Sequence, residues 1–207
     1  MNKRLKLIEE IIKRSESKDW SSAKNEWYFQ YIYYASEEQK CLCTQQIHNI
    51  CVIKNKISGV ETEVGNECVK QFLGISTGDN ILKSIQHLRN DSCNSLNLHA
   101  LDYLFENKVI NIKDYDFYNG IRSKRNLSQA RLKWKLDINQ KFLKFTSYDF
   151  NKKLQTINNM ILTMEEMNQN TDFIKDVRSK FIQYGNLTDN QRDSINNIYT
   201  KFIKKPE

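Results

Sequence analysis

Apolar residues recur at helical spacing over most of the chain. Leu5, Ile8 and Ile12 are three and four positions apart, which predicts an amphipathic helix near the start. A second helix is expected to begin after Asp19 or Ser21, either of which can cap its first turn. The same spacing predicts further helices over residues 79–88, 98–105 and 115–121.

Between residues 29 and 64 the pattern changes to that of short strands. Residues 29–34 are aromatic enough for a strand, and residues 47–54 and 60–64 are predicted to pair as a β-hairpin. The intervening segment has turn chemistry, with Gly59 free to adopt a positive φ. After the break at Gly65, a helix is expected to carry Cys68 in its first turn.

Four of the five cysteines lie in this region, with the spacing C-x-C-x7-C-x16-C. Thiols clustered at loop-sized spacing in a chain without secretory features usually bind a metal, and four thiolates suit tetrahedral zinc. We therefore predict one structural Zn²⁺ held by Cys41, Cys43, Cys51 and Cys68, with His48 as a reserve ligand. The alternative is four buried structural thiols without a metal.

The order of a thiol-rich knuckle, a hairpin and a helix with a ligand near its N-terminus resembles the treble-clef class of zinc modules. Members of that class usually place two ligands on the knuckle as C-x-x-C and two on the helix. Here the knuckle is C-x-C, Cys51 lies on the hairpin, and only Cys68 lies on the helix.

The cysteine block C-x-C…C…N-x-x-S-G-x4-V-G-x-x-C-V-x-x-F also resembles a family of uncharacterised proteins from bacteria and their phages. The resemblance covers residues 18–145 at most, and its specific part is the cysteine block. It implies a zinc module and an association with phages or mobile elements, and it implies no catalytic activity.

The composition supports a mainly helical fold. Among 207 residues there are 6 Gly and 1 Pro, too few for turn-rich sandwiches or barrels. We expect a mainly α protein with a small zinc-bound β-hairpin module, divided into residues 1–75 (N-terminal helices plus zinc module) and 76–207 (a helical region). No apolar run approaches the roughly 20 residues of a membrane span, and the basic start turns acidic before a signal-peptide core forms. We therefore expect a soluble, cytoplasmic protein.

The net charge of +7 comes from one segment. Residues 113–153 carry 11 basic and 4 acidic side chains, an excess equal to that of the whole chain. This segment predicts a surface that binds nucleic-acid phosphates; the alternative is a solvated helix face. The predicted contact residues are Arg122, Lys124, Arg125, Arg131, Lys133, Lys135, Lys141 and Lys144.

The basic segment is also part of an internal repeat. Residues 117–145 resemble residues 173–204, and each unit is predicted to form a helix, a turn and a helix. In the second copy Gly185 is expected to end one helix, and Thr188 to cap the next. Helix-turn-helix pairs bind DNA in some proteins and are only structural in many others. In the first copy the aromatic stripe that begins with Trp134 is predicted to be buried.

These features favour a non-enzymatic zinc protein that binds DNA or RNA through the basic segment, and the resemblance implies a relation to phages or mobile elements. A second hypothesis is a protein-binding adaptor or inhibitor of a host or phage machine, for which the many aromatic residues would supply interface anchors. A third is a divergent zinc-fold nuclease, although His48 on the hairpin has no partner histidine on the helix after Cys68. No motif for a small-molecule substrate is evident.

Overall fold

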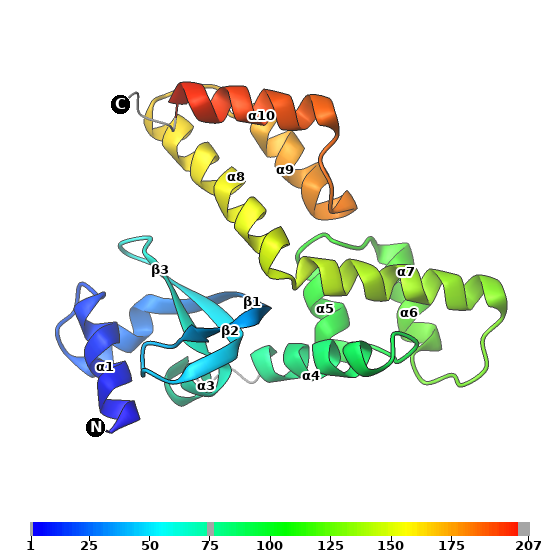
Figure 1. Ribbon diagram of the computed structural model, residues 1–207, viewed down its shortest axis with the longest axis horizontal. Helices are drawn as coiled ribbons and strands as arrows, with labels where there is room; N and C mark the ends of the chain where they lie inside the picture. The colour runs from blue at the N-terminus through cyan, green and yellow to red at the C-terminus, as the bar shows by residue number, and fades with distance from the viewer. Residues whose placement is uncertain (1, 74–76, 203–207) are drawn as a thin grey trace. The chain divides into compact units, whose positions relative to one another are not determined.

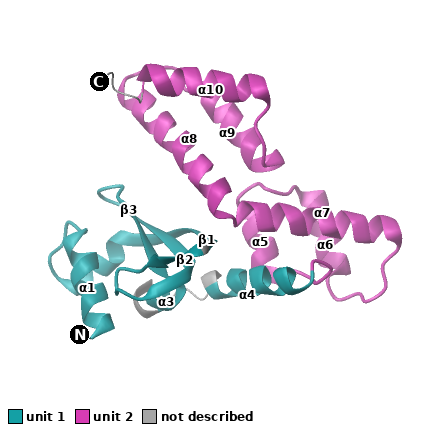
Figure 2. Cartoon of the chain, viewed as in Figure 1, with its two compact units in different colours: residues 1–91 teal, residues 92–207 magenta. Residues whose placement is uncertain are grey.

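The computed structural model describes residues 2–73 and 77–202 and divides the chain into two compact units, residues 1–91 and 92–207 (Figures 1 and 2). The sequence-based boundary lies earlier, between residues 75 and 76, so the helix over residues 77–90 is assigned to the first unit. The fold is mainly helical, with a small antiparallel sheet in the first unit. Within the described ranges, no helix combines the length and the apolar character that crossing a membrane requires.

The first unit surrounds its sheet with short helices. Its elements are α1 (Lys3–Lys13), α2 (Trp20–Ala23), the 3-10 turn η1 (Lys24–Glu26), β1 (Trp27–Lys40), β2 (Gln46–Asn55), β3 (Glu61–Gly65), α3 (Asn66–Leu73) and α4 (Thr77–Asn90). The strands pair antiparallel in the order β1-β2-β3, which confirms the predicted hairpin and adds a longer β1 beside it. Gly59 has a φ of 71° in the turn between β2 and β3, as predicted.

Strand β2 is the centre of the sheet and is covered on both faces. On one face Cys51 lies opposite Ile32 of β1 and Val64 of β3, and all three side chains are buried. On the other face Ile50 packs in a cluster with Tyr33. A strand buried on both sides lacks the alternation of a half-buried strand, which explains the run of buried residues from position 50 to 53.

The helix predicted at the start of the chain is confirmed as α1, but its buried stripe differs from the predicted one. Leu7 and Ile11 are buried, whereas Leu5 is 56% exposed. Asp19 caps the second helix by accepting from the Ser22 N–H at 3.0 Å. That helix ends at Ala23, where the chain continues as the 3-10 turn η1 and then extends into β1 at Trp27.

The second unit contains only helices among its described residues. They are α5 (Leu98–Glu106), α6 (Ile112–Ile121), α7 (Gln129–Phe145), α8 (Tyr148–Glu166), α9 (Asp172–Tyr184) and α10 (Asp189–Phe202). A buried polar network joins α6 and α7 to the loop before α5: the Tyr118 hydroxyl donates to Asn139 and accepts from the Leu96 N–H at 2.9 Å. The Asn139 amide in turn donates to the backbone carbonyls of Ser92 and Asn94.

The repeat matches best in its second half. Helices α7 and α10 begin at corresponding positions, one residue after Ser128 and Thr188. Thr188 and Gln191 exchange the two hydrogen bonds of a capping box, and Gly185 ends α9 with a φ of 73°, both as predicted. The first halves differ, because α6 ends at Ile121 whereas α9 continues to Tyr184. The last residues of the second copy, 203 and 204, lie outside the described residues.

Candidate metal centre

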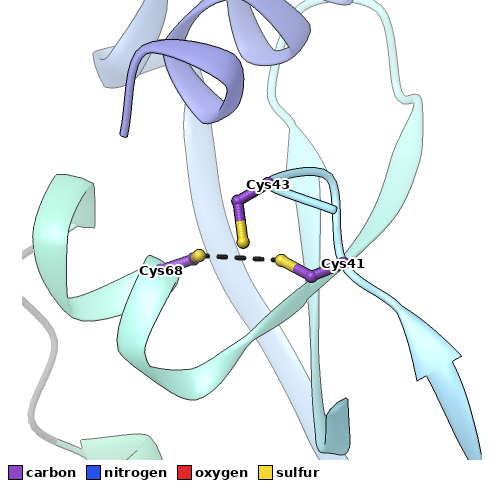
Figure 3. A group of neighbouring side chains, drawn as sticks. All are labelled: Cys41, Cys43 and Cys68. Atoms are coloured by element: carbon purple, nitrogen blue, oxygen red, sulfur yellow. Dashed lines mark hydrogen bonds between the residues drawn. The ribbon is translucent and has the colours of Figure 1, made fainter. Parts of the chain in front are cut away.

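A tight turn at the end of β1 carries the first two thiols. The Thr44 N–H donates to the Cys41 carbonyl at 2.8 Å, and the Cys41 N–H donates to the Gln45 carbonyl at 2.9 Å. Thr44 adopts a φ of 74°, which is uncommon for a β-branched residue. This turn directs the Cys41 and Cys43 sulfur atoms toward the same point (Figure 3).

Helix α3 supplies the third thiol. Cys68 is the third residue of this helix, and its side chain points toward the two thiols of the turn (Figure 3). The free N–H groups and the dipole of a helix N-terminus favour negative charge nearby, which suits a thiolate in the first turn.

Gly65 allows the chain to approach this site closely. Its N–H donates to the Cys41 sulfur at 3.2 Å. A Cβ at this position would lie 3.1 Å from the Ile47 Cγ2 atom and 4.0 Å from the Cys41 sulfur. From the sequence, Gly65 was expected only to break the chain; a glycine directly before a cysteine-bearing helix is the signal for this close approach.

The three sulfur atoms are spaced as metal ligands require. Those of Cys41, Cys43 and Cys68 all lie within 4.8 Å of one another, and the Cys41 and Cys68 sulfurs are 3.6 Å apart. Tetrahedral zinc with Zn–S bonds of about 2.3 Å separates its sulfur ligands by about 3.8 Å. All three residues are buried. The donor set, the spacing and the burial therefore fit a thiolate-bound metal ion such as zinc.

Electrostatics favour a thiolate within this group. A hydrogen bond joins the sulfur atoms of Cys41 and Cys68 and lowers the pKa of Cys41 to about 5, with the backbone N–H groups of Cys43 and Gly65 acting in the same direction. The same bond raises the pKa of Cys68, which keeps its proton. Because the thiolate is the form that binds metals, the site already stabilises one ligand in its binding state.

Cys51, the fourth predicted ligand, is fully buried on β2 but does not belong to the group of three. Burial raises its pKa to about 12, and the charge of nearby Cys41 adds to this effect. His48, the reserve ligand, is also outside the group: its Nδ1 lies 3.0 Å from the Ala35 carbonyl oxygen and its ring stacks on Tyr34. The structure thus brings together three of the four predicted cysteines.

The predicted phosphate contacts fall into two sets. Lys124, Arg125, Arg131 and Lys133 are exposed and Arg122 is half-buried, in the loop after α6 and the first turns of α7. The remaining three make contacts within the unit. Lys141 lies 3.6 Å from an Asp114 oxygen, and Lys144 donates to Asn186 at 2.8 Å.

Lys135 requires a correction. It is 5% exposed, and its ammonium group donates to the Cys93 carbonyl at 2.7 Å. A side chain held in this way cannot contact a phosphate. Lys133 and Lys135 are two residues apart on α7, so their side chains point in different directions. That of Lys135 points into the interior of the unit.

No family model, curated protein or solved structure matches this chain. The resemblance to bacterial and phage proteins therefore stays a prediction.

Proposed function

We propose that this chain is a non-enzymatic zinc protein that binds nucleic acid through the hairpin formed by α6 and α7. The zinc would be structural, in a treble-clef-like module whose knuckle, hairpin and helix supply Cys41, Cys43, Cys51 and Cys68. The group of three buried thiols supports the metal. Cys51 is proposed as the fourth ligand because it is buried and near enough to Cys41 to feel its charge.

The zinc proposal is tested by metal content and by cobalt substitution. Protein purified without added metal is expected to contain one zinc per chain. The Co²⁺ form should show sulfur-to-metal charge-transfer absorption, and Cys51→Ser should lower its intensity by about a quarter, because one of four thiolates is lost. Cys93→Ser is the matched control, since Cys93 is exposed. Unchanged absorption in Cys51→Ser would remove Cys51 from the ligand set.

The nucleic-acid proposal depends on one observation. Five cations on one hairpin have no carboxylate within 4.0 Å in the described part of the chain, namely Arg122, Lys124, Arg125, Arg131 and Lys133. Cations without an internal partner are available to neutralise phosphates and release the counterions condensed on nucleic acid. Binding through such contacts positions the protein without selecting a base sequence.

Salt dependence tests this proposal. The logarithm of the association constant for duplex DNA should fall linearly with the logarithm of salt concentration, by about 0.9 per phosphate neutralised. The double variant Arg131→Gln/Lys133→Gln should lower this slope by about 1.8 and leave the fold intact, since both side chains are exposed. Lys152→Gln/Lys153→Gln is the control: it removes the same charge from exposed positions of α8 and should keep the wild-type slope.

The adaptor hypothesis is the second candidate, and exposed apolar residues favour it. Around the turn between α8 and α9, Leu162, Met167 and Phe173 are each between 45% and 49% exposed. Exposed apolar side chains near one another are typical of protein interfaces. If the wild-type chain shows no salt-dependent binding to DNA or RNA, the nucleic-acid proposal is wrong and the adaptor hypothesis takes its place.

A further inference from the structure

An aromatic pair on the α6–α7 hairpin differs from the buried stripe that the sequence predicts. Trp134 of α7 stacks on Phe117 of α6, with ring centroids 3.8 Å apart and planes 8° from parallel. Trp134 nevertheless remains 40% exposed. The other members of the stripe (Ile138, Phe142 and Phe145) are buried as predicted. Because Phe117 covers one face of the indole, the exposed surface of Trp134 lies on its opposite face and edge.

The indole is held in place by a hydrogen bond as well as by the stack. Its Nε1–H donates to an Asp114 carboxylate oxygen at 2.8 Å. Asp114 is itself fixed, because it is buried and forms a capping box with Asn111 at the start of α6. An exposed ring that is stacked on one face and hydrogen-bonded at its edge loses little conformational entropy when a ligand covers the other face.

The partnerless cations lie on one side of this ring along the hairpin. Arg131 is three residues before Trp134, so the two side chains share a face of α7. Arg122 follows Phe117 by five residues, which corresponds to about 7.5 Å along a helix axis. No acidic residue occurs between positions 117 and 136, whereas Asp137 is exposed one turn beyond Trp134. The charge is therefore purely positive from the ring toward the loop, whereas acidic and basic side chains are mixed on the other side of the ring.

We propose that the hairpin binds single-stranded nucleic acid, with an unpaired base stacked on the open face of Trp134 and the backbone phosphates bound by Arg131 and the loop cations. This inference rests on the proposed function and names its substrate class. Stacking requires a base whose face is free, and the bases of a duplex already stack on one another. Base–aromatic stacking tolerates any base, so we expect this contact to bind without selecting a base sequence.

The first experiment compares Trp134→Ala with wild type on a single-stranded oligonucleotide and on a duplex of equal length. Single-strand affinity should fall between about fivefold and about a hundredfold, the effect of losing one stacked base. Duplex affinity and the salt slope for both ligands should stay at wild-type values, because the phosphate contacts are intact. Thermal unfolding followed by circular dichroism establishes that the variant is folded.

A second variant keeps the test decisive if the alanine variant unfolds. Trp134→Phe retains an aromatic ring that can stack on Phe117. The difference in indole fluorescence between wild type and this variant is the signal of Trp134. Binding of a single strand should quench the fluorescence of wild type and of Trp20→Phe, and the quenching should be absent in Trp134→Phe.

The outcomes distinguish this inference from the nucleic-acid proposal on which it rests. If Trp134→Ala binds a single strand with wild-type affinity, or if quenching persists in Trp134→Phe, the stacking proposal is wrong. A salt-dependent affinity would still support nucleic-acid binding in that case. Equal affinity of the wild type for duplex and single strand also contradicts it. Absence of salt-dependent binding to either ligand overturns both proposals.

Discussion

The two units of this chain are each stabilised by a different kind of internal contact. In residues 1–91 three consecutive strands form an antiparallel sheet, and a group of buried thiols joins the end of β1 to the start of α3. In residues 92–207 successive helices pack on one another, and the buried polar side chains are spread over several helices, among them those of Asp114, Tyr118, Lys135, Asn139, Thr146 and Asn151. The first unit thus has one cluster of thiols that a metal can cross-link. The second unit is instead stabilised by hydrogen bonds spread over several helices.

The largest expected effect follows from removing the proposed zinc. Cys68→Ser, or a chelator, should unfold the first unit and leave the helices of the second, because structural zinc contributes about 10–16 kcal/mol in zinc-finger peptides. That range is as large as the whole stability of a typical domain, about 5–15 kcal/mol. Hydrogen exchange read by mass spectrometry should show lost protection in residues 2–73 and retained protection in α7 and α8.

Cys93→Ser is the control for this experiment, since Cys93 is exposed and outside the thiol group. If Cys68→Ser keeps wild-type protection in β2 and β3, the first unit does not depend on a metal and the contrast between the units is wrong.

The second unit should lose stability when its polar network is cut. Asn139→Ala removes three hydrogen bonds, and it leaves the carbonyls of Ser92 and Asn94 and the Tyr118 hydroxyl without that partner. The free energy of unfolding should fall by about 3 kcal/mol, because each buried polar group left unpaired costs about 1–3 kcal/mol. Urea denaturation followed by helical circular dichroism measures the change. Gln140→Ala, at the exposed neighbouring position, should change it by less than about 0.5 kcal/mol.

The first unit should also carry an acid-sensitive contact that the second does not depend on. The hydrogen bond from Asn55, followed by that from Ser17, lowers the pKa of Glu26 from 4.5 to about 2. A carboxylate whose pKa is lowered on folding contributes stability that is complete above its unfolded pKa and lost as the pH falls to its folded pKa.

Between pH 4.5 and about 2, Glu26→Gln should therefore lose less stability than wild type, while being less stable at neutral pH. The pH dependence of hydrogen exchange in residues 2–73 measures this. Glu37→Gln is the matched control, since Glu37 is exposed on β1 and should follow the wild-type curve. Parallel curves for Glu26→Gln and wild type would show that this carboxylate does not couple folding to pH.

The smallest effects concern two backbone positions with nearly equal φ. Thr44 in the first unit has a φ of 74°, and Gly185 in the second has a φ of 73°. Left-handed backbone costs a residue with a Cβ about 1–2 kcal/mol, and the extra freedom of unfolded glycine offsets about 0.5–1 kcal/mol of that. Thr44→Gly should therefore stabilise the first unit by about 0.5 kcal/mol.

Gly185→Ala should have the opposite sign. Besides the backbone cost, its Cβ would lie 2.7 Å from the Lys144 Cδ atom, so that flexible side chain must move. Chemical denaturation of both variants measures the two changes. A destabilising Thr44→Gly would show that the threonine side chain, and not its backbone conformation, is what the cysteine turn requires.

The local features of this chain follow from the sequence by itself. Side-chain spacing and turn residues act over a few positions, so the hairpin, the positive φ at Gly59, the capping box at Thr188 and the helix over residues 79–88 were all predicted from neighbouring residues. The cysteine spacing likewise indicated a metal site, and three of its four thiols do meet.

The tertiary structure alone decided which side chains of these elements face the interior. Lys133 and Lys135 lie close together on α7. Lys135 donates a hydrogen bond to the loop before α5, whereas Lys133 is exposed to solvent. Phe117 and Trp134 meet because the loop after α6 folds the chain back on itself, and no periodicity within either helix encodes that contact. In the same way, the register of β2 against β3 sets the position of Cys51, which lies near Cys41 but outside the group of three thiols. Packing between distant segments determines which side chains are buried, since each segment alone is compatible with more than one buried face.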